Sequence, residues 1–298
     1  MYTGFGTIVT AAVTPFGADG NIDHDAFRRI LRHLEANGSD GVVIAGTTGE
    51  APTLSDDEKL ALIRTAVDEV GGRLVVMAGT GSNDTSHSVE LTRAAIEAGA
   101  DAVLVVTPYY NKPPREGLLR HFTAVAQAAG DKPVMLYNVP SRVVTVLEPE
   151  LIAELAQIPN VVALKQAHPD LRHLSEIRLL APDLAVYAGD DDSLLPMLPS
   201  GVLGVVSVAS HVAGPQMKRV VELWKDGLED EAREVAGDLE DVYETLGITT
   251  NPIPVKAAMQ LLGFETGTLR LPLVEASGMQ RERIQGMLER LGLVGSHA

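Results

Sequence analysis

The chain of 298 residues contains no cysteine. Disulfide bonds, thiolate zinc sites, iron–sulfur clusters and a cysteine nucleophile are therefore excluded. The absence also fits a reducing compartment. Residues 1–10 lack the basic segment followed by an apolar stretch that marks a signal peptide. We therefore expect a cytoplasmic protein.

Basic residues are also scarce, and long apolar runs are missing. The chain has 24 Lys and Arg against 40 Asp and Glu, so its formal net charge is −16. Nucleic acid demands a basic surface, so we expect no nucleic-acid partner. No apolar run approaches the ~18 residues that a membrane span needs, so we expect no membrane partner. Hydrophobic residues nevertheless make up 45% of the chain, which excludes a wholly disordered protein.

What the chain does contain is an alternation of short apolar runs and longer helical patterns. The runs are about five residues long and nearly all apolar, as parallel strands buried on both faces are. The eight runs cover residues 6–13, 41–45, 73–78, 102–107, 133–137, 161–164, 185–187 and 202–208. Residues typical of helix starts and stops lie between them. The expected starts are Asp23, Ser55, Asn83 and Glu148, and the expected stops are Gly38, 71–72, Gly99 and Gly130.

Eight strand–helix units fit a (β/α)8 TIM barrel better than an open doubly wound sheet, which usually has about five or six strands. After Trp224 the pattern changes, because residues 228–246, 255–262 and 275–291 are helical in pattern with no strand between them. We therefore predict an α/β barrel over 1–227 and a small C-terminal helical domain over 228–298. The acidic stretch that opens the second domain is interpreted as a solvated helix face.

Two lysines stand out as candidate reactive groups. In a barrel, catalytic residues lie at the carboxyl ends of strands, and Lys165 directly follows the apolar run 161–164. Desolvation there lowers the pKa of an amine, which can then form a Schiff base with a ketone. A lysine that reaches to the barrel mouth or pairs with a carboxylate explains the position equally well. Lys256 lies outside the eight units and is predicted to be structural.

Hydroxyl and glycine residues gather at the same strand ends. Three of the six tyrosines, Tyr109, Tyr110 and Tyr137, fall there, where they can shuttle protons or pack at the rim. Residues 46–49 (GTTG) offer consecutive backbone N–H groups that suit a carboxylate, although such a turn is often only a helix cap. Residues 79–81 (GTG) leave the same choice open, and neither turn is a P-loop or a dinucleotide fingerprint.

Three consecutive aspartates, 190–192, follow the seventh run. A divalent metal is one interpretation. However, no pair of histidines accompanies them at the strand ends, where His168 stands alone, and a metal-dependent aldolase is expected to have several histidine ligands. A cap for the following helix is the simpler interpretation. We therefore predict no metal site.

Taken together, these motifs resemble the dihydrodipicolinate synthase and N-acetylneuraminate lyase superfamily of class I pyruvate aldolases, and within it the dihydrodipicolinate synthase family. The resemblance covers essentially the whole chain. It rests on residues 10–16 (TAAVTPF), 46–50 (GTTGE), 106–111 (VTPYYN), 137–142 (YNVPSR), Lys165, 188–191 (AGDD) and 251–256 (NPIPVK).

The resemblance implies a role for individual residues. Lys165 corresponds to the lysine that forms the Schiff base with pyruvate, and Tyr137 to the general acid/base beside it. Thr48 and Tyr110 complete a proton relay, in which Tyr110 enters the site of a neighbouring subunit. The relay thus requires at least a dimer, and the usual assembly is a homotetramer. The remaining residues bind substrate: Thr47 and Thr48 hold the pyruvate carboxylate, Arg142 holds the carboxylate of the second substrate, and Gly189 and Val206 line the pyruvate pocket.

The implied activity is the condensation of pyruvate with aspartate-4-semialdehyde, a step of diaminopimelate and lysine biosynthesis, with no cofactor. Arg142 favours that acceptor. Two alternatives stay open: a Schiff-base aldolase or dehydratase acting on 2-keto-3-deoxy sugar acids, and a non-catalytic barrel that binds 2-oxo acids. The chain departs from the family at Gln166, where an acidic residue is common, and at 143–144 (VV), where Thr-Gly is common. Alternation along a strand points residue 166 away from Lys165, so we expect Gln166 to act indirectly.

The resemblance also bears on regulation. Lysine-inhibited members bind lysine partly through an acidic residue, and the corresponding position here is His87. Asp56 and Lys59 occupy positions where inhibited members often have histidines. A cation near the ammonium group of the ligand is unfavourable, and a neutral imidazole still loses the ion pair. We therefore expect weak or no inhibition by lysine.

Overall fold

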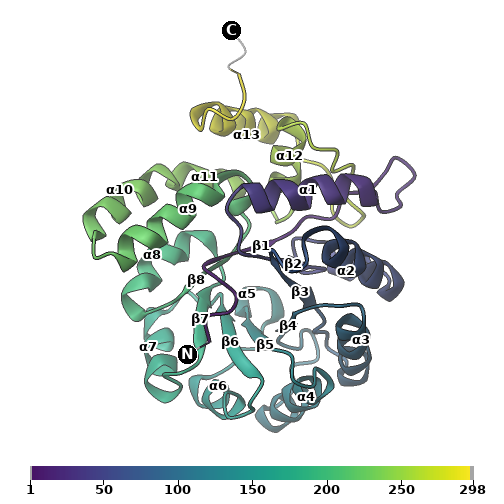
Figure 1. The fold of residues 1–298 in the computed structure, drawn as a ribbon, viewed down its shortest axis with the longest axis vertical. Coiled ribbons are helices and arrows are strands. Elements are labelled where there is room, and N and C mark those ends of the chain that lie inside the picture. Colours follow the sequence, from purple (N-terminus) through teal and green to yellow (C-terminus); the bar gives the residue numbers. More distant parts are fainter. Residues whose placement is uncertain (1, 296–298) are drawn as a thin grey trace.

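The computed structural model describes residues 2–295 and contains a closed barrel of eight parallel strands, as predicted (Figure 1). Each strand pairs with the next, and β8 pairs with β1 to close the barrel. The strands are β1 Ile8–Ala11, β2 Gly41–Ile44, β3 Val75–Gly79, β4 Ala102–Val106, β5 Val134–Asn138, β6 Val161–Gln166, β7 Ala185–Ala188 and β8 Gly204–Ser207. Every predicted run thus contains or overlaps a strand.

Helices surround the strands in Figure 1. Those of the barrel are α1 His24–Ala36, α2 Asp56–Val70, α3 Thr85–Glu97, α4 Arg115–Ala128, α5 Pro140–Val143, α6 Pro149–Leu155, α7 Leu171–Leu180, α8 Leu194–Met197 and α9 Ser210–Lys225. Those that follow are α10 Glu229–Asp238, α11 Glu240–Leu246, α12 Ile253–Leu261 and α13 Gly278–Arg290. Short 3₁₀ turns cover Ala51–Thr53, Asp191–Ser193 and Leu198–Ser200.

The alternation of side chains along the strands divides the core into two layers. One layer fills the barrel interior, and the other lies between the strands and the helices. On β6, Ala163 belongs to the interior and Leu164 to the outer layer. Lys165 therefore points inward and Gln166 outward, which is the arrangement that alternation predicted.

Local capping residues explain where several helices begin. The carboxylate of Asp23 accepts a hydrogen bond from the N–H of Ala26, and Ser55 forms a capping box with Glu58. Both starts were predicted correctly. The prediction of Asn83 was wrong by one residue, because Asp84 accepts from the N–H groups that open α3. Glu148 precedes α6 without a side-chain cap.

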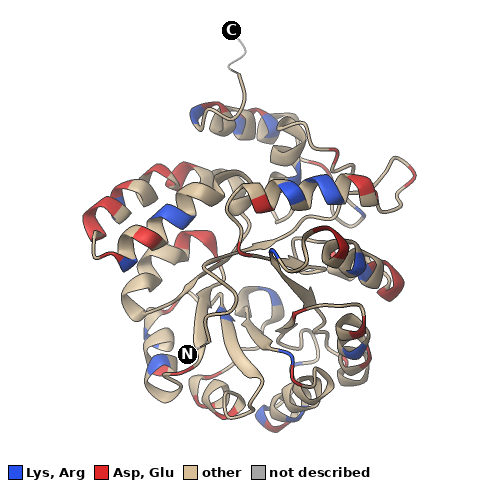
Figure 2. Cartoon of the chain, viewed as in Figure 1, with Lys and Arg blue, Asp and Glu red and all other residues tan. Residues whose placement is uncertain are grey.

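The C-terminal segment is helical, as expected, but its first helix is interrupted. Residues 228–246 form α10 and α11, which meet at Leu239. The acidic residues that open α10 are exposed, as predicted, and Figure 2 shows them on the outer edge of the molecule. The C-terminal helices share one continuous apolar core with the outer layer of the barrel, through residues such as Val242 and Met259. A boundary at 227 remains a proposal.

Within residues 2–295, no helix combines the length and the apolar character that crossing a bilayer requires.

Candidate active site

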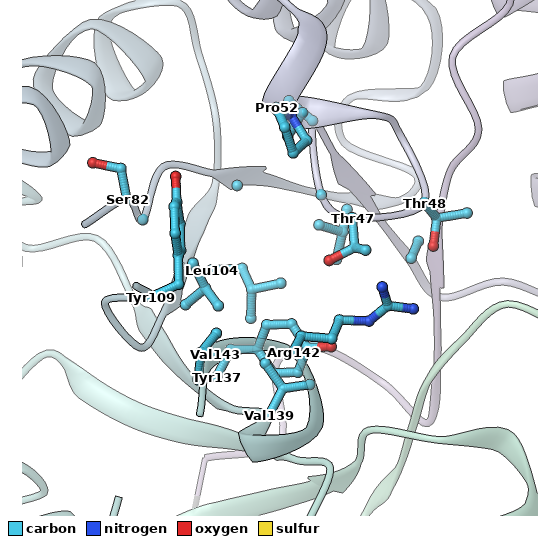
Figure 3. Close-up of a pocket in the computed structure, with 18 of the residues that line it drawn as sticks. Thr47, Thr48, Pro52, Ser82, Leu104, Tyr109, Tyr137, Val139, Arg142 and Val143 are labelled. Atoms are coloured by element: carbon cyan, nitrogen blue, oxygen red, sulfur yellow. The ribbon is translucent and has the colours of Figure 1, made fainter. Parts of the chain in front are cut away.

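A cavity of about 940 Å³ opens at the carboxyl ends of the strands. Seven of the eight predicted site residues line it: Thr47, Thr48, Tyr110, Tyr137, Arg142, Lys165 and Gly189. Figure 3 shows several of them around one space, with the guanidinium of Arg142 extending toward Thr47 and Thr48. Val206 is not brought to the cavity. It lies in the barrel interior, 1% exposed, while Val208 lines the cavity instead.

Lys165 belongs to β6 itself, so the strand extends past the predicted end at residue 164. Its side chain is 6% exposed, and its Nζ lies 4.3 Å from the centre of the Tyr137 ring. Tyr137 is its partner in the register of β5 and β6. Among the described residues, no carboxylate lies within ion-pair distance of the Lys165 ammonium. The amine of Lys165 therefore contacts the electron-rich face of the Tyr137 ring and has no carboxylate to balance its charge.

The backbone around Tyr137 is held rigidly. The N–H and the hydroxyl of Thr107, which follows β4, both donate to the carbonyl of Tyr137, at 3.0 and 2.9 Å. Two donors on one carbonyl fix the end of β5 relative to β4. The Tyr137 side chain, 6% exposed, is thereby aimed at the amine of Lys165.

The turn that follows β2 carries the two threonines. Gly46 accepts from the N–H groups of Gly49 and Ala51, and Thr14 donates its hydroxyl to the carbonyl of Gly49 at 2.8 Å. The turn ends at Glu50, which has a left-handed backbone (φ 57°). Such a conformation is rare outside glycine and persists only where the surroundings enforce it.

Lys256 provides that enforcement, and it is structural, as predicted. Its ammonium is fully buried and donates to Glu50 at 2.8 Å and to the carbonyls of Thr14 and Thr268. The second carboxylate oxygen of Glu50 accepts from the N–H of Arg270. The C-terminal segment is thus bound directly beneath the turn that carries Thr47 and Thr48.

Asn251 is a site residue that the sequence reasoning missed. It lines the cavity, and its Nδ2 donates to the hydroxyl oxygen of Thr48 at 3.0 Å. Its Oδ1 is buried and has no hydrogen-bond partner among the described residues. Because the amide occupies one lone pair of the Thr48 oxygen, the threonine proton is available to another acceptor. The only signal in the sequence was the place of Asn251 at the start of the motif 251–256.

Tyr110 lies at the rim of the cavity and differs from the other tyrosines. Its side chain is 89% exposed, and its backbone is left-handed (φ 73°). The neighbouring Tyr109 is 38% exposed and also lines the cavity. The Tyr110 ring therefore lies mostly in solvent at the rim of its own cavity.

Asp190, which sequence reasoning considered only as a metal ligand or a cap, also lines the cavity. Burial raises the pKa of its carboxyl, and Asp192 adds to this, while Lys165 and Arg142 oppose it. Asp190 therefore interacts electrostatically with both cations of the site, Lys165 and Arg142.

Asp191 corrects the prediction of a cap for the following helix. Its carboxylate accepts from the N–H groups of Val208 and Ala209, so it holds the segment between β8 and α9 instead of capping the helix that follows it. Within the part of the chain that the structure describes, no cluster of three or more His, Asp or Glu side chains could hold a metal ion.

Comparisons with known proteins agree with this geometry. The model of the dihydrodipicolinate synthetase family matches residues 4–291. A 4-hydroxy-tetrahydrodipicolinate synthase of Synechococcus elongatus is 48% identical over 290 residues, which cover 97% of both chains. The dihydrodipicolinate synthase of Cyanidioschyzon merolae, solved with lysine bound, has a TM-score of 0.95 and is 42% identical, covering 97% of this chain and 99% of that one. A dihydrodipicolinate synthase of Bacillus anthracis has a TM-score of 0.93 at 43% identity, covering 96% and 98%.

The barrel, the inward lysine and the relatives together define a lyase of the class I aldolase type. More particularly, the chain belongs to the dihydrodipicolinate synthetase family.

Proposed function

We propose that this chain condenses pyruvate with L-aspartate-4-semialdehyde, as a 4-hydroxy-tetrahydrodipicolinate synthase. The observation that carries the proposal is the position of Lys165: its amine is almost buried, contacts Tyr137 and shares one cavity with a threonine turn and Arg142.

The chemistry follows from these groups. The Lys165 amine attacks the ketone carbon of pyruvate and expels water, which gives a Schiff base. Loss of a proton from the methyl group produces an enamine, whose carbon attacks the aldehyde of the acceptor, and the resulting alkoxide takes up a proton. The amine of the acceptor then attacks the Schiff-base carbon, which closes the ring and releases the Lys165 amine. The N–H groups of the turn at 46–49 and the hydroxyls of Thr47 and Thr48 bind the pyruvate carboxylate. We assign the proton transfers to Tyr137 and Thr48, because both residues line the cavity beside Lys165.

Both substrates are anions, whereas the protein carries a formal charge of −16. Attraction by the overall field is therefore unfavourable, and local donors must bind the substrates. Arg142 lines the cavity, and its fork of N–H groups can bind the acceptor carboxylate with two hydrogen bonds.

Borohydride reduction in the presence of pyruvate tests the proposal. We expect a reduced pyruvyl adduct on the peptide that contains Lys165. Lys165→Ala should abolish the adduct and lower turnover by about 10⁴-fold or more. Lys225→Met serves as the control, because this lysine is exposed and lies outside the cavity, and it should keep the adduct. An unmodified Lys165 in folded protein would refute Schiff-base catalysis. A panel of sugar-acid and semialdehyde acceptors then decides the second substrate.

We further propose that the working form is a homotetramer in which Tyr110 reaches the site of a neighbouring subunit. The exposure and the strained backbone of Tyr110 support this, because an aromatic ring left in water at the rim of its own cavity needs a covering surface. A two-fold axis between two subunits would place two such rings reciprocally, one at each site.

We also propose that lysine does not inhibit this enzyme. Asp56 already holds Lys59 at 3.0 Å and His87 at 2.8 Å. Burial raises the pKa of Asp56, but these two partners outweigh burial and lower it overall. The carboxylate is therefore satisfied within its own chain, and two cationic or neutral groups face any incoming ammonium.

Titration with lysine at saturating pyruvate tests this inference. We expect full activity at about 1 mM lysine, where a ligand without its ion pair stays unbound. The double variant Lys59→His/His87→Glu supplies an acidic partner and should become sensitive. Inhibition of the unaltered enzyme at sub-millimolar lysine would contradict the proposal.

A further inference from the structure

A closed ring of hydrogen bonds lies behind the catalytic strands, on the side facing the helices. The ring begins at Leu147, whose N–H donates to Asn138 Oδ1 at 3.0 Å. Asn138 Nδ2 donates to Gln166 Oε1 at 3.0 Å, and Gln166 Nε2 lies 2.8 Å from His173 Nδ1. His173 Nε2 returns to the carbonyl of Leu147 at 3.1 Å. The three side chains are at most 8% exposed.

The backbone of Leu147 determines the direction of every bond in this ring. A peptide N–H can only donate, so Asn138 must present its oxygen to Leu147 and its NH₂ to Gln166. A carbonyl can only accept, so Nε2 of His173 must carry a proton. Gln166 then uses its oxygen toward Asn138 and its NH₂ toward His173. The ring is therefore complete only with a neutral His173 whose Nδ1 is an acceptor.

The ring closes the loop that carries Arg142. Asn138 is the last residue of β5, and Leu147 lies just before α6. Residues 139–146 therefore form a loop whose flanking residues are hydrogen-bonded to each other. Four of those eight residues, Val139, Arg142, Val143 and Val144, line the cavity. Gln166 ties the same closure to β6, one residue after Lys165.

We propose that Asn138, Gln166 and His173 are positioning residues that hold the Arg142 loop and thereby set the affinity for the carboxylate-bearing acceptor. The inference rests on the proposed function, since it assigns Arg142 to the second substrate. None of the three residues lines the cavity, so they act through the loop. A fully satisfied buried network of this kind is rigid, whereas breaking one link leaves several polar groups unpaired.

The surroundings of His173 favour the neutral form. Burial lowers the pKa of His173, and the stacked ring of His168, 4.4 Å away between ring centres, lowers it further. Glu148, Glu176 and the carbonyl of Leu147 oppose this shift. A proton on Nδ1 would set two donors, Nδ1–H and Gln166 NH₂, against each other. The loop is therefore expected to loosen as the pH falls through the pKa of His173.

His173→Phe tests the inference, because phenylalanine keeps the ring volume and the stacking on His168 but removes both polar atoms. We expect the KM for aspartate-4-semialdehyde to rise about tenfold, as one unpaired buried polar group predicts, with borohydride trapping of pyruvate unchanged. His121→Phe is the matched control: it removes a buried imidazole on α4 and should leave both measurements unchanged. An unchanged acceptor KM, or an equal loss of pyruvate trapping, would overturn the inference.

Hydrogen–deuterium exchange of residues 139–147 provides a readout that does not depend on the reaction. In the unaltered protein we expect the protection of these amides to fall at acid pH. In His173→Phe we expect their protection to be low at every pH. Gln166→Glu should reverse the dependence, because a carboxylate accepts from a protonated Nδ1 and completes the ring with the imidazolium. If the unaltered protein uses no semialdehyde, the proposed function is wrong, and the exchange pattern still tests whether the ring holds the loop. Equal protection of residues 139–147 in all variants would refute the role of the ring.

Discussion

Lys165 and Lys256 are both almost completely buried, and their surroundings give them opposite roles. The amine of Lys256 has a carboxylate and two carbonyls as partners and lies outside the cavity, so it cannot reach a substrate. Lys165 has the face of Tyr137 and an open cavity, so its amine remains available to a ketone. Burial alone therefore does not mark a reactive lysine, and the difference lies in whether the buried charge is paired.

The pair formed by Lys256 and Glu50 gives a prediction at the scale of residues. Lys256→Met should lower the free energy of unfolding by about 3–5 kcal/mol, because Glu50 is left as an unpaired buried charge. The double variant Lys256→Met/Glu50→Gln should recover part of this loss, since no buried charge remains. Urea unfolding measures both, and the exposed Lys225→Met is the control. A double variant less stable than Lys256→Met would contradict the explanation.

At the scale of elements, the C-terminal segment is fastened to the barrel beside the site. Arg270 donates to Glu58 on α2 and to the carbonyls of Thr53 and Gly20. It also lies over the ring of Phe16, 4.4 Å from its centre. One guanidinium thus joins the C-terminal segment, the loop between β1 and α1, and α2, and so supports the threonine turn from the outside.

This contact predicts how stability depends on pH. The hydrogen bonds from Arg270 lower the pKa of Glu58 to about 2. A depressed carboxyl pKa stabilises the fold above the unfolded-state value, so the contribution is complete above about pH 4.5 and is lost as the pH falls toward about 2. Glu58→Gln should therefore cost about 1 kcal/mol at neutral pH, discounted because the pair is partly exposed, and much less near pH 2.

Thermal unfolding across this pH range measures the difference between the two proteins. Glu116→Gln, which removes a more exposed pair within α4, is the control and should have little effect at any pH. A constant difference between Glu58→Gln and the unaltered protein down to pH 2 would exclude the ion pair as its cause.

At the scale of the whole molecule, the exposed Tyr110 predicts that two chains share each site. Co-expressed Lys165→Ala and Tyr110→Phe chains should recover activity, because in a mixed pair one site receives an intact lysine and an intact tyrosine. Random pairing restores about a quarter of all sites, since about half of the pairs are mixed and each has one complete site. Lys165→Ala mixed with Tyr137→Phe is the control: both residues belong to one chain's cavity, so no mixed pair has a complete site and no activity should be recovered. A chain that carries both the Lys165 and the Tyr110 change gives an independent test.

The doubly altered chain, Lys165→Ala/Tyr110→Phe, distinguishes the two arrangements. Mixed with unaltered chains, it spoils the unaltered partner's site only when Tyr110 acts across the interface. The activity per unaltered chain should then fall as the doubly altered chain is added in excess. In the same mixture with Lys165→Ala alone, the activity per unaltered chain should stay unchanged. Equal activity in both mixtures would place Tyr110 within its own site.

Much of the barrel could be predicted from the sequence because the signals are local. Strand runs, inward and outward alternation, and the caps Asp23 and Ser55 depend on residues only a few positions apart. Seven of the eight site residues that the family resemblance implied line one cavity, where the strand ends of the barrel meet. The role of Asn251 could not be predicted, since its partner Thr48 lies 203 residues away.

The sequence by itself determined the number of strands, the face on which each side chain lies and the strand end that holds Lys165. These follow from backbone geometry, because side chains return to the same face every two residues in a strand and about every 3.6 residues in a helix. Both periods can be recognised from residues that are close together in the sequence. Only the tertiary structure decided which distant groups became partners: Lys256 with Glu50, Asp191 with the start of α9, and Gln166 with His173. Closing the barrel brings these groups together, and each buried polar group must then find its partner in that fixed arrangement.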